Sequence, residues 1–320
     1  MTPFAWPLRQ PFVSRALALL CLALSAVLTA PAAHAATLVV DLDGFATATN
    51  CSSGAAAFNS IQTAVNAAAP GDTIFVCPGQ YNEQVVVSKN NLTILGSGVG
   101  STVLRPSSVV FNSTALTTPG LVPVAPVLLV RDVVGVTVTR LSIDGSGAPG
   151  AGAGPSSCGF IPHFYGLFYR NASGTVDTVH VTNIRSATVC AIGTRIESGG
   201  GGSASVVFRA NLVDHYGAAG VVCAGLTTAC TITGSTVRGL GAVNDQFQVG
   251  ISVRTGAVAR IAGNVITDHF HLLGNGRSFG STGILLVYTD PATNPHLLRD
   301  NIFANNELNV ARFSTAEVFD

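Results

Sequence analysis

The apolar positions between residues 58 and 100 recur at first with helical spacing. Four residues lie on one stripe: Ile61, Ala64, Val65 and Ala68. Asn59 or Ser60 can cap the start of such a helix, and Pro70-Gly71 stops it. The pattern predicts one short helix here.

After this helix the pattern changes to short strands. Three are predicted, separated by turn residues: Thr73–Val76, Gln84–Val87 and Leu92–Leu95. Strands this short, after an amphipathic helix, are typical of the first coil of a parallel β-helix. The helix would cover the open end, where unpaired backbone could recruit another chain.

The rest of the chain repeats weakly. Residues 136–144 alternate apolar and polar side chains, as strands with one buried face do. Later coils open on a glycine or alanine 25 to 33 residues apart, at Gly166, Ala191, Gly220, Gly250 and Gly283. Such a period indicates stacked units, about ten coils, and parallel strands need right-handed crossovers. The predicted fold is therefore all-β: a single-stranded right-handed parallel β-helix (solenoid) over residues 36–320, with a short N-terminal capping helix.

An asparagine recurs near the end of the second strand of each coil. It stands at Asn183, Asn211, Asn264 and Asn301, with Thr236 at the equivalent position of the coil that opens at Gly220. Asparagine tolerates a left-handed backbone, and its amide can bond to the next coil. A structural ladder is predicted. Two stretches interrupt the repeat as inserted loops, Val110–Pro126 and Gly145–Gly159.

Residues 1–35 have the composition of a bacterial-type signal peptide. Arg9 and Arg15 precede an apolar run, Ala16–Ala30, that is short for a membrane span, and Ala33-His34-Ala35 is an A-x-A cleavage site. Cleavage would leave no transmembrane segment and a secreted or periplasmic protein. It would also leave 14 basic against 16 acidic side chains. A nucleic-acid partner is not expected, because phosphates require a basic surface.

The six remaining cysteines are even in number, which favours disulfides in an exported chain. Sequence leaves fifteen pairings open. Proximity favours Cys51–Cys77, Cys158–Cys190 and Cys223–Cys230; buried free thiols are the alternative.

The first coil resembles that of right-handed parallel β-helix proteins of the pectin lyase-like superfamily, including pectin methylesterases. The phrase F-x-S-I-Q-x-A-V-x-A-A-x-P-G-D-T-I-x-V-x-P-G-x-Y-x-E-x-V recurs in that family, and residues 58–85 match it. The resemblance implies the fold and leaves function open, since the superfamily holds lyases, hydrolases, esterases, epimerases and non-enzymes. The D-F-I-F-G phrase of pectin methylesterases is absent, as are the N-T-D, D-D, G-H-G and R-I-K segments of polygalacturonases.

Three function classes follow. The first, suggested by the resemblance and by the long groove of a solenoid, is a protein that binds an extended polysaccharide. The second is a polysaccharide lyase or epimerase with an unfamiliar site, and the third is a structural or adhesive surface protein. No cofactor is predicted. Calcium binding is an alternative, but a calcium site needs several clustered carboxylates, and those of this chain are scattered singly along the sequence. A monomer is expected.

One pattern could carry chemistry. An Asp-His-aromatic triplet occurs twice, 54 residues apart, at Asp214-His215-Tyr216 and Asp268-His269-Phe270. Arg238 and Arg185 lie at comparable places in other coils. Stacked on one face, these side chains could bind an acidic sugar and move a proton; packing and turn contacts are the alternative.

The densest aromatic cluster, residues 160–169, contains Phe164, Tyr165 and Tyr169. These rings could stack on a sugar or pack in a coil.

Overall fold

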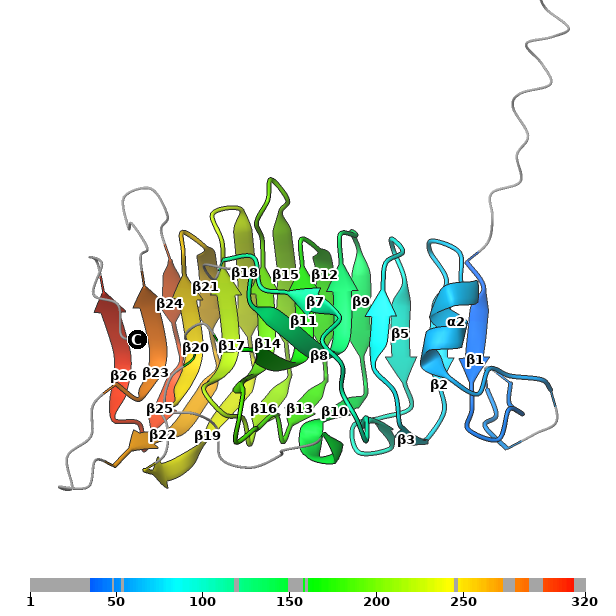
Figure 1. Cartoon of the computed structure of the whole chain (residues 1–320), viewed down its shortest axis with the longest axis horizontal. Helices are drawn as coiled ribbons and strands as arrows, with labels where there is room; N and C mark the ends of the chain where they lie inside the picture. The colour runs from blue at the N-terminus through cyan, green and yellow to red at the C-terminus, as the bar shows by residue number, and fades with distance from the viewer. Residues whose placement is uncertain are drawn as a thin grey trace, which may run out of the picture. The chain divides into compact units, whose positions relative to one another are not determined.

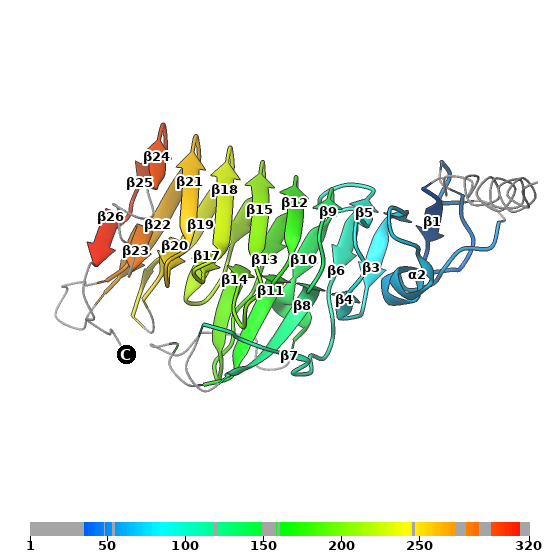
Figure 2. The same ribbon diagram turned by 90° about the horizontal axis from the view of Figure 1, so that it is seen from above.

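The computed structural model describes residues 35–47, 49–52, 55–117, 121–148, 158, 161–244, 247–272, 280–287 and 296–313. The predicted signal peptide, except Ala35, lies outside these residues, as do parts of the second predicted loop. The described chain winds through three parallel sheets that run side by side along the stack (Figures 1 and 2). The right-handed parallel β-helix expected from the sequence is confirmed.

Each sheet collects one strand from each coil. Sheet 1 contains β1 (Thr37–Val40), β2 (Thr73–Val76), β5 (Thr93–Gly96), β9 (Val136–Thr139), β12 (Ser173–Asp177), β15 (Ala204–Arg209), β18 (Thr228–Thr233), β21 (Val258–Ala262) and β24 (Leu297–Arg299). Sheet 2 contains β3 (Gly79–Tyr81), β6 (Thr102–Leu104), β10 (Ser142–Asp144), β13 (His180–Thr182), β16 (Leu212–Asp214), β19 (Thr236–Val243), β22 (Val265–His271) and β25 (Ile302–Ala304). Sheet 3 contains β4 (Val85–Val87), β8 (Pro123–Arg131), β11 (His163–Arg170), β14 (Cys190–Glu197), β17 (Ala219–Ala224), β20 (Val249–Arg254), β23 (Thr282–Val287) and β26 (Leu308–Phe313), with β7 (Ser113–Thr114) antiparallel to β8.

The described strands form eight full coils after β1, fewer than the predicted ten, because insertions between strands lengthen several coils. The first predicted strand is β2, and the next two are β4 and β5 with small shifts of their ends. Strand β3 was not predicted: it begins at Gly79, among the turn residues between the first two predicted strands. The last residues of the first predicted loop, from Pro123 onward, belong to strand β8. The second predicted loop begins with a short 3-10 helix, η1 (Gly145–Gly147).

The core is built of columns, because strands of successive coils pair in register. One column in sheet 1 runs through Ile74, Ile94, Val138, Val176, Phe208, Ile232, Ile261 and Leu298. Another, in sheet 2, runs through Leu104, Ile143, Val181, Val213, Val237, Ile266 and Phe303. Nearly all of these side chains are buried. Each apolar side chain therefore packs against its equivalents in the neighbouring coils, which removes apolar surface from water along the whole stack.

The predicted capping helix is α2 (Ile61–Ala67), and both of its ends are held by later side chains. At its start Ser60 is the N-cap, and the Glu83 carboxylate accepts bonds from the Ile61 and Gln62 amides at 2.7 and 2.9 Å. At its end Lys89 Nζ donates to the carbonyl oxygens of Asn66 and Ala68. A negative group at the first turn and a positive group at the last complement the helix dipole.

The asparagine ladder exists, with a different membership from the predicted one. The register places Asn211, Ser235, Asn264 and Asn301 at one turn of consecutive coils. Asn264 Oδ1 accepts from the Ser235 amide, and its Nδ2 donates to the Ile232 carbonyl and to Asn301 Oδ1. Asn183 lies outside this ladder: its Nδ2 donates to Asp144, and Val179 occupies the position that pairs with Asn211. Ser235, not Thr236, takes the place of an asparagine.

The left-handed backbone at these turns belongs to the residue before the ladder position. Ala210, Gly234, Gly263 and Asp300 have φ values of 53°, 57°, 65° and 56°. The ladder asparagines therefore contribute side-chain hydrogen bonds between coils. The predicted tolerance of a left-handed backbone is not needed at the ladder positions, because the preceding residue adopts it.

A glycine column runs through five consecutive strands of sheet 3, from β11 to β23. Strand pairing flanks Gly166 and Gly193 identically, so Gly193, not Ala191, is the equivalent residue. A Cβ on Gly193 would lie 2.6 Å from the Gly220 carbonyl oxygen of the next coil, so a side chain cannot be placed there. The recurring glycine of the sequence is thus a consequence of close coil stacking.

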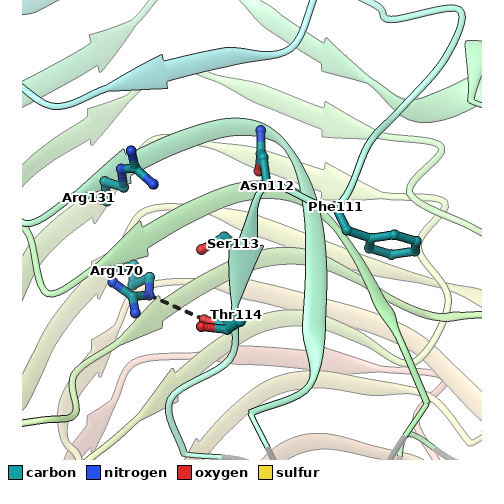
Figure 3. Close-up of a pocket in the computed structure, with 6 residues that line it drawn as sticks. All are labelled: Phe111, Asn112, Ser113, Thr114, Arg131 and Arg170. Atoms are coloured by element: carbon teal, nitrogen blue, oxygen red, sulfur yellow. Dashed lines mark hydrogen bonds between the residues drawn. The ribbon is translucent and has the colours of Figure 1, made fainter.

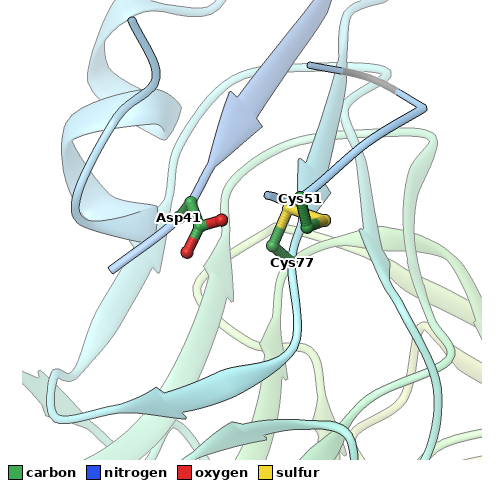
Figure 4. A group of neighbouring side chains, drawn as sticks. All are labelled: Asp41, Cys51 and Cys77. Atoms are coloured by element: carbon green, nitrogen blue, oxygen red, sulfur yellow. A yellow bond between two sulfur atoms is a disulfide. The ribbon is translucent and has the colours of Figure 1, made fainter. Parts of the chain in front are cut away.

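The three disulfides favoured by proximity are those in the structure: Cys51–Cys77, Cys158–Cys190 and Cys223–Cys230. Cys51–Cys77 joins the segment before α2 to the end of β2 (Figure 4). In the described part of the chain, no helix has the length and apolarity needed to cross a membrane.

We predict that Asn264→Ala lowers the free energy of unfolding by about 1–3 kcal/mol, because it leaves the Ser235 amide and the Ile232 carbonyl unpaired inside the stack. Chemical denaturation monitored by circular dichroism measures the change. Asn66→Ala is the control: Asn66 is exposed on α2 and its amide oxygen accepts one bond, from Gln62, so a change within about 0.5 kcal/mol is expected. Equal stability of the two variants would contradict the ladder.

We predict the opposite effect for Thr194→Val. Thr194 pairs with Leu167 and Val221 in an interior column of sheet 3, and its buried hydroxyl has no hydrogen-bond partner. Replacing an unpaired hydroxyl with a methyl of the same shape should raise the free energy of unfolding by about 1 kcal/mol. A lower melting temperature for Thr194→Val would show that the hydroxyl is satisfied.

Candidate functional site

A cluster of charged side chains lies on the outer face of sheet 2, centred on Asp214 at the end of β16. Asp214 Oδ1 lies 3.0 Å from His180 Nε2 and 3.1 Å from His215 Nδ1, and its Oδ2 accepts from Arg238 at 3.0 Å. The Asp214 side chain is 4% exposed, whereas those of His215 and Arg238 are about half exposed. The side chains of His180, His215 and Arg238 thus cover the Asp214 carboxylate, which lies outside the apolar core.

Asp214 remains ionised in this environment. Burial by itself would raise the pKa of Asp214, but hydrogen bonds from His180, Thr182 and His215 outweigh it and hold this pKa well below its usual range. The cluster therefore has a fixed negative centre surrounded by hydrogen-bond donors.

The predicted column of Asp, His and Arg is only partly formed. Register pairs Asp214 with Arg238 and Arg238 with Thr267, so the second triplet is displaced by one residue. Asp268 instead bonds to Thr267 and to Asn305. Asp268 has a left-handed backbone (φ 65°), and the register between β19 and β22 shifts at this point, so that Gly241 pairs with His269. This irregularity breaks the alternation of faces after Thr267, and the second triplet does not join the cluster.

His269 is fully buried, on the opposite side of its strand from Thr267's outward column. Its Nε2 makes a short hydrogen bond with the Tyr216 hydroxyl, and its Nδ1 lies 2.7 Å from Asn306 Oδ1. Burial lowers the pKa of His269 to about 4, with smaller opposing effects of Asn306 and Asp268. As a neutral imidazole it donates to Asn306 and accepts from Tyr216, which is a packing contact between coils.

The aromatic residues proposed to stack on a sugar are also buried. Phe164 and Tyr169 belong to the interior core, and Tyr165 lies in a second apolar cluster on the outer face of sheet 3. Their rings offer no open face, so the packing alternative describes them. Arg185 is half-buried, and its Nε has no hydrogen-bond partner among the described residues.

A second candidate site lies at the edge of sheet 3. It is an open pocket of about 410 Å³ lined by Phe111, Asn112, Ser113, Thr114, Arg131 and Arg170 (Figure 3). Arg131 and Arg170 end β8 and β11 and pair in register, so one coil separates them. The segment 110–117, here called the strap, carries β7 and faces the two arginines, while the Phe111 ring points away from them.

The two arginines differ in their bonding. Arg170 Nε donates to the Thr114 carbonyl at 3.2 Å, and its Nη1 lies 3.4 Å from Asp132. Arg131 is exposed, and no hydrogen bond or ion pair holds its guanidinium to the described residues. In the same pocket the buried Oδ1 of Asn112 has no partner there. The pocket thus presents one unengaged guanidinium beside an anchored one.

The strap is fixed to the sheet next to this pocket by a buried ion pair. Arg195 Nη2 donates to Glu197 Oε1 at 2.8 Å, and Thr117 of the strap bonds to both side chains. Burial would raise the pKa of Glu197, but Arg195 lowers it below its ordinary value. Removing one partner of such a pair would leave an uncompensated buried charge.

One group of the described residues has metal-ligand spacing, namely Asp41, Cys51 and Cys77. The two sulfur atoms are bonded to each other in a disulfide, so they are not thiolate ligands (Figure 4). This group therefore does not hold a metal.

Sequence reasoning missed His180 and the arginine pocket. His180 reaches Asp214 only because β13 pairs with β16. The arginines could have been found from the sequence, because the same residue type recurs at the end of three apolar strands of sheet 3, at Arg131, Arg170 and Arg254.

No family model matches the chain, and no curated protein matches it. Solved structures similar to it include pectin methylesterase PemA from Erwinia chrysanthemi (12% identity, 90% of this chain and 91% of that chain, TM-score 0.42) and the pectin methylesterase from Aspergillus niger (12%, 90% and 88%, 0.39). A third is the GH136 lacto-N-biosidase from Eubacterium ramulus (9%, 87% and 68%, 0.42). These identities and scores carry no inference about activity. The strand topology itself shows the fold, a parallel β-helix of three sheets.

We predict that folding stability falls as the pH is lowered from about 6.5 to 4. The unfolded chain binds a proton at His269 with an ordinary pKa, whereas the folded protein binds it only near pH 4. Acidification through this window therefore favours unfolding, by up to about 3 kcal/mol in total.

Denaturation of wild type and His269→Gln at several pH values between 7 and 4 measures this effect. The variant should be less stable at pH 7 and should lose the part of the slope that one proton contributes. Identical slopes would show that His269 does not titrate in this way.

Proposed function

We propose that this chain is an exported β-helix protein that binds an extended anionic polysaccharide at the arginine pocket of sheet 3. The observation that carries the proposal is the pair Arg131 and Arg170, held one coil apart beside the hydroxyls of the strap. A guanidinium pairs with a carboxylate through two parallel hydrogen bonds. Sugars that carry carboxylates, the uronic acids, are the matching class.

The repeat of the solenoid supports a polymer as ligand. Coils follow one another at about 4.8 Å, the spacing of paired strands, so equivalent side chains form a straight row along the outer face. Arg254 lies in the same row as Arg131 and Arg170, three coils beyond Arg170. Glu197, which is buried and paired with Arg195, and Ala224 stand between Arg170 and Arg254 in this row. An acidic polymer would therefore meet adjacent guanidinium groups only at Arg131 and Arg170, in two neighbouring coils.

The three disulfides support an oxidising location outside the cytosol. This agrees with the signal peptide and the secreted or periplasmic location expected from the sequence.

We predict that the protein binds polygalacturonate or alginate and that Arg131→Ala weakens binding about tenfold or more, because it removes a charge-assisted hydrogen bond. Arg131→Lys should recover part of the loss. Affinity electrophoresis and calorimetry against these polymers, with dextran as the neutral comparison, measure the effect. Added salt should weaken binding, since the pocket is open to solvent.

Arg209→Ala is the matched control, because Arg209 is an exposed arginine of sheet 1 paired with Asp177. Its affinity should equal that of wild type. Binding that is equal for dextran, or equal in Arg131→Ala and Arg209→Ala, would contradict the pocket. Absence of binding to every polymer would favour a structural or adhesive role instead.

A further inference from the structure

One outward column of sheet 1 holds threonine in five successive strands, β1, β2, β5, β9 and β12 (Figures 1 and 2). Strand pairing sets Thr37, Thr73, Thr93, Thr137 and Thr175 side by side in this order. The residue that follows each of them packs into or against the apolar core, so the alternation along a strand turns the threonines outward. Their side chains therefore repeat along the stack at the spacing of paired strands, about 4.8 Å.

The neighbouring outward column is uncharged at the same end of the solenoid. Two residues after each threonine of the first four strands, it contains Val39, Phe75, Leu95 and Thr139. Charge begins only on the next strand, at Asp177. The two columns on β1, β2, β5 and β9 are here called the threonine face: Thr37, Val39, Thr73, Phe75, Thr93, Leu95, Thr137 and Thr139.

The fold itself does not require threonine in this column. The side chains are exposed or half-buried, and their hydroxyl groups make no hydrogen bond to the part of the chain that the structure describes. Valine and isoleucine suit a strand equally well, and further along the same column Val207 and Arg260 take equivalent positions. The hydroxyl groups of the threonine face therefore have water as their partner, in an array that the sheet holds fixed.

We propose that the threonine face binds the surface of ice. Each threonine offers a hydroxyl group that donates and accepts hydrogen bonds and a methyl group that does neither, so a row of threonines holds water molecules at regular intervals. The strand spacing is close to a repeat distance of the ice lattice, and in-register pairing keeps it constant from Thr37 to Thr175. A partner that is itself periodic is therefore contacted at every one of these strands.

The absence of charge on the threonine face favours ice over a dissolved ionic ligand. A charged side chain loses its hydration only at a cost in free energy, and ice offers no counter-ion to offset that cost. The apolar members Val39, Phe75 and Leu95 instead gain free energy when their surface leaves liquid water. The arginine pocket of sheet 3 has no part in this contact, so the inference does not depend on the proposed function.

Partition into slowly grown ice tests the inference. The protein, purified after export, is placed in dilute buffer around a cold ice-coated surface, and its concentration in the ice is compared with that in the remaining liquid. Growing ice excludes a solute that does not bind it, whereas the wild type should be enriched in the ice. Thr93→Lys places a charge at the centre of the face and should abolish the enrichment, and Thr93→Val, which removes only the hydroxyl group, should reduce it.

Thr231→Lys is the matched control. Thr231 has the same residue type and the same column, but it lies beyond the threonine face, between Val207 and Arg260. This variant should partition like the wild type. Circular dichroism should show nearly equal melting temperatures for all of these variants, because the substituted side chains point to solvent.

Exclusion of the wild type from ice, or equal enrichment of the wild type and Thr93→Lys, overturns the inference. Two other occupants have distinct signatures. A wild-type dimer that becomes a monomer in Thr93→Lys, measured by sedimentation, would assign the face to a second copy of the chain. Binding to insoluble cellulose that Thr93→Lys abolishes would assign it to a neutral polymer. Either result without enrichment in ice also overturns the inference.

Discussion

The in-register pairing of parallel strands from one coil to the next is the constraint on which the rest of the structure depends. It satisfies the backbone of each strand inside the stack with neighbours above and below, and it forces equivalent residues into columns. Inward columns become a continuous apolar core. Turn positions become a ladder in which Asn264 joins Ser235 to Asn301. A side chain in one coil must therefore also pack against the equivalent side chains of the two neighbouring coils.

The first coil needs separate treatment, because a stack of strands ends in unpaired backbone. Strand β1 adds one more partner to sheet 1, and α2 packs beside the first strands. This helix has only seven residues, too few to be stable alone. Glu83 and Lys89, which follow it in sequence, bond to its two ends. The first coil thus stabilises the element that closes it.

Stacking also decides how chemistry is distributed over the outer faces. The core is apolar, so charged residues appear in outward columns, where one coil places them beside the next. On sheet 2 this brings His180, Asp214 and Arg238 together from three strands, and on sheet 3 it aligns Arg131 with Arg170. Asp214 thereby contacts side chains that lie 34 positions before it and 24 positions after it in the chain. The two clusters lie on different sheets.

Local sequence was sufficient for the helix, for the alternating strands and for the three disulfides, since each depends on spacing within one or two coils. The first coil and β9–β10 lie where the apolar pattern placed them. The register between coils was not determined locally, because inserted loops change the number of residues per turn. That is why Asn183 was aligned with Asn211, and why Asp268 and His269 were assigned to a column with Asp214. The register shift after the pair Arg238 and Thr267 turns His269 into the interior, and pairing of β13 with β16 brings in His180, which no local pattern marked. Which side chains share a face is a property of strand register, and only the tertiary structure fixes it.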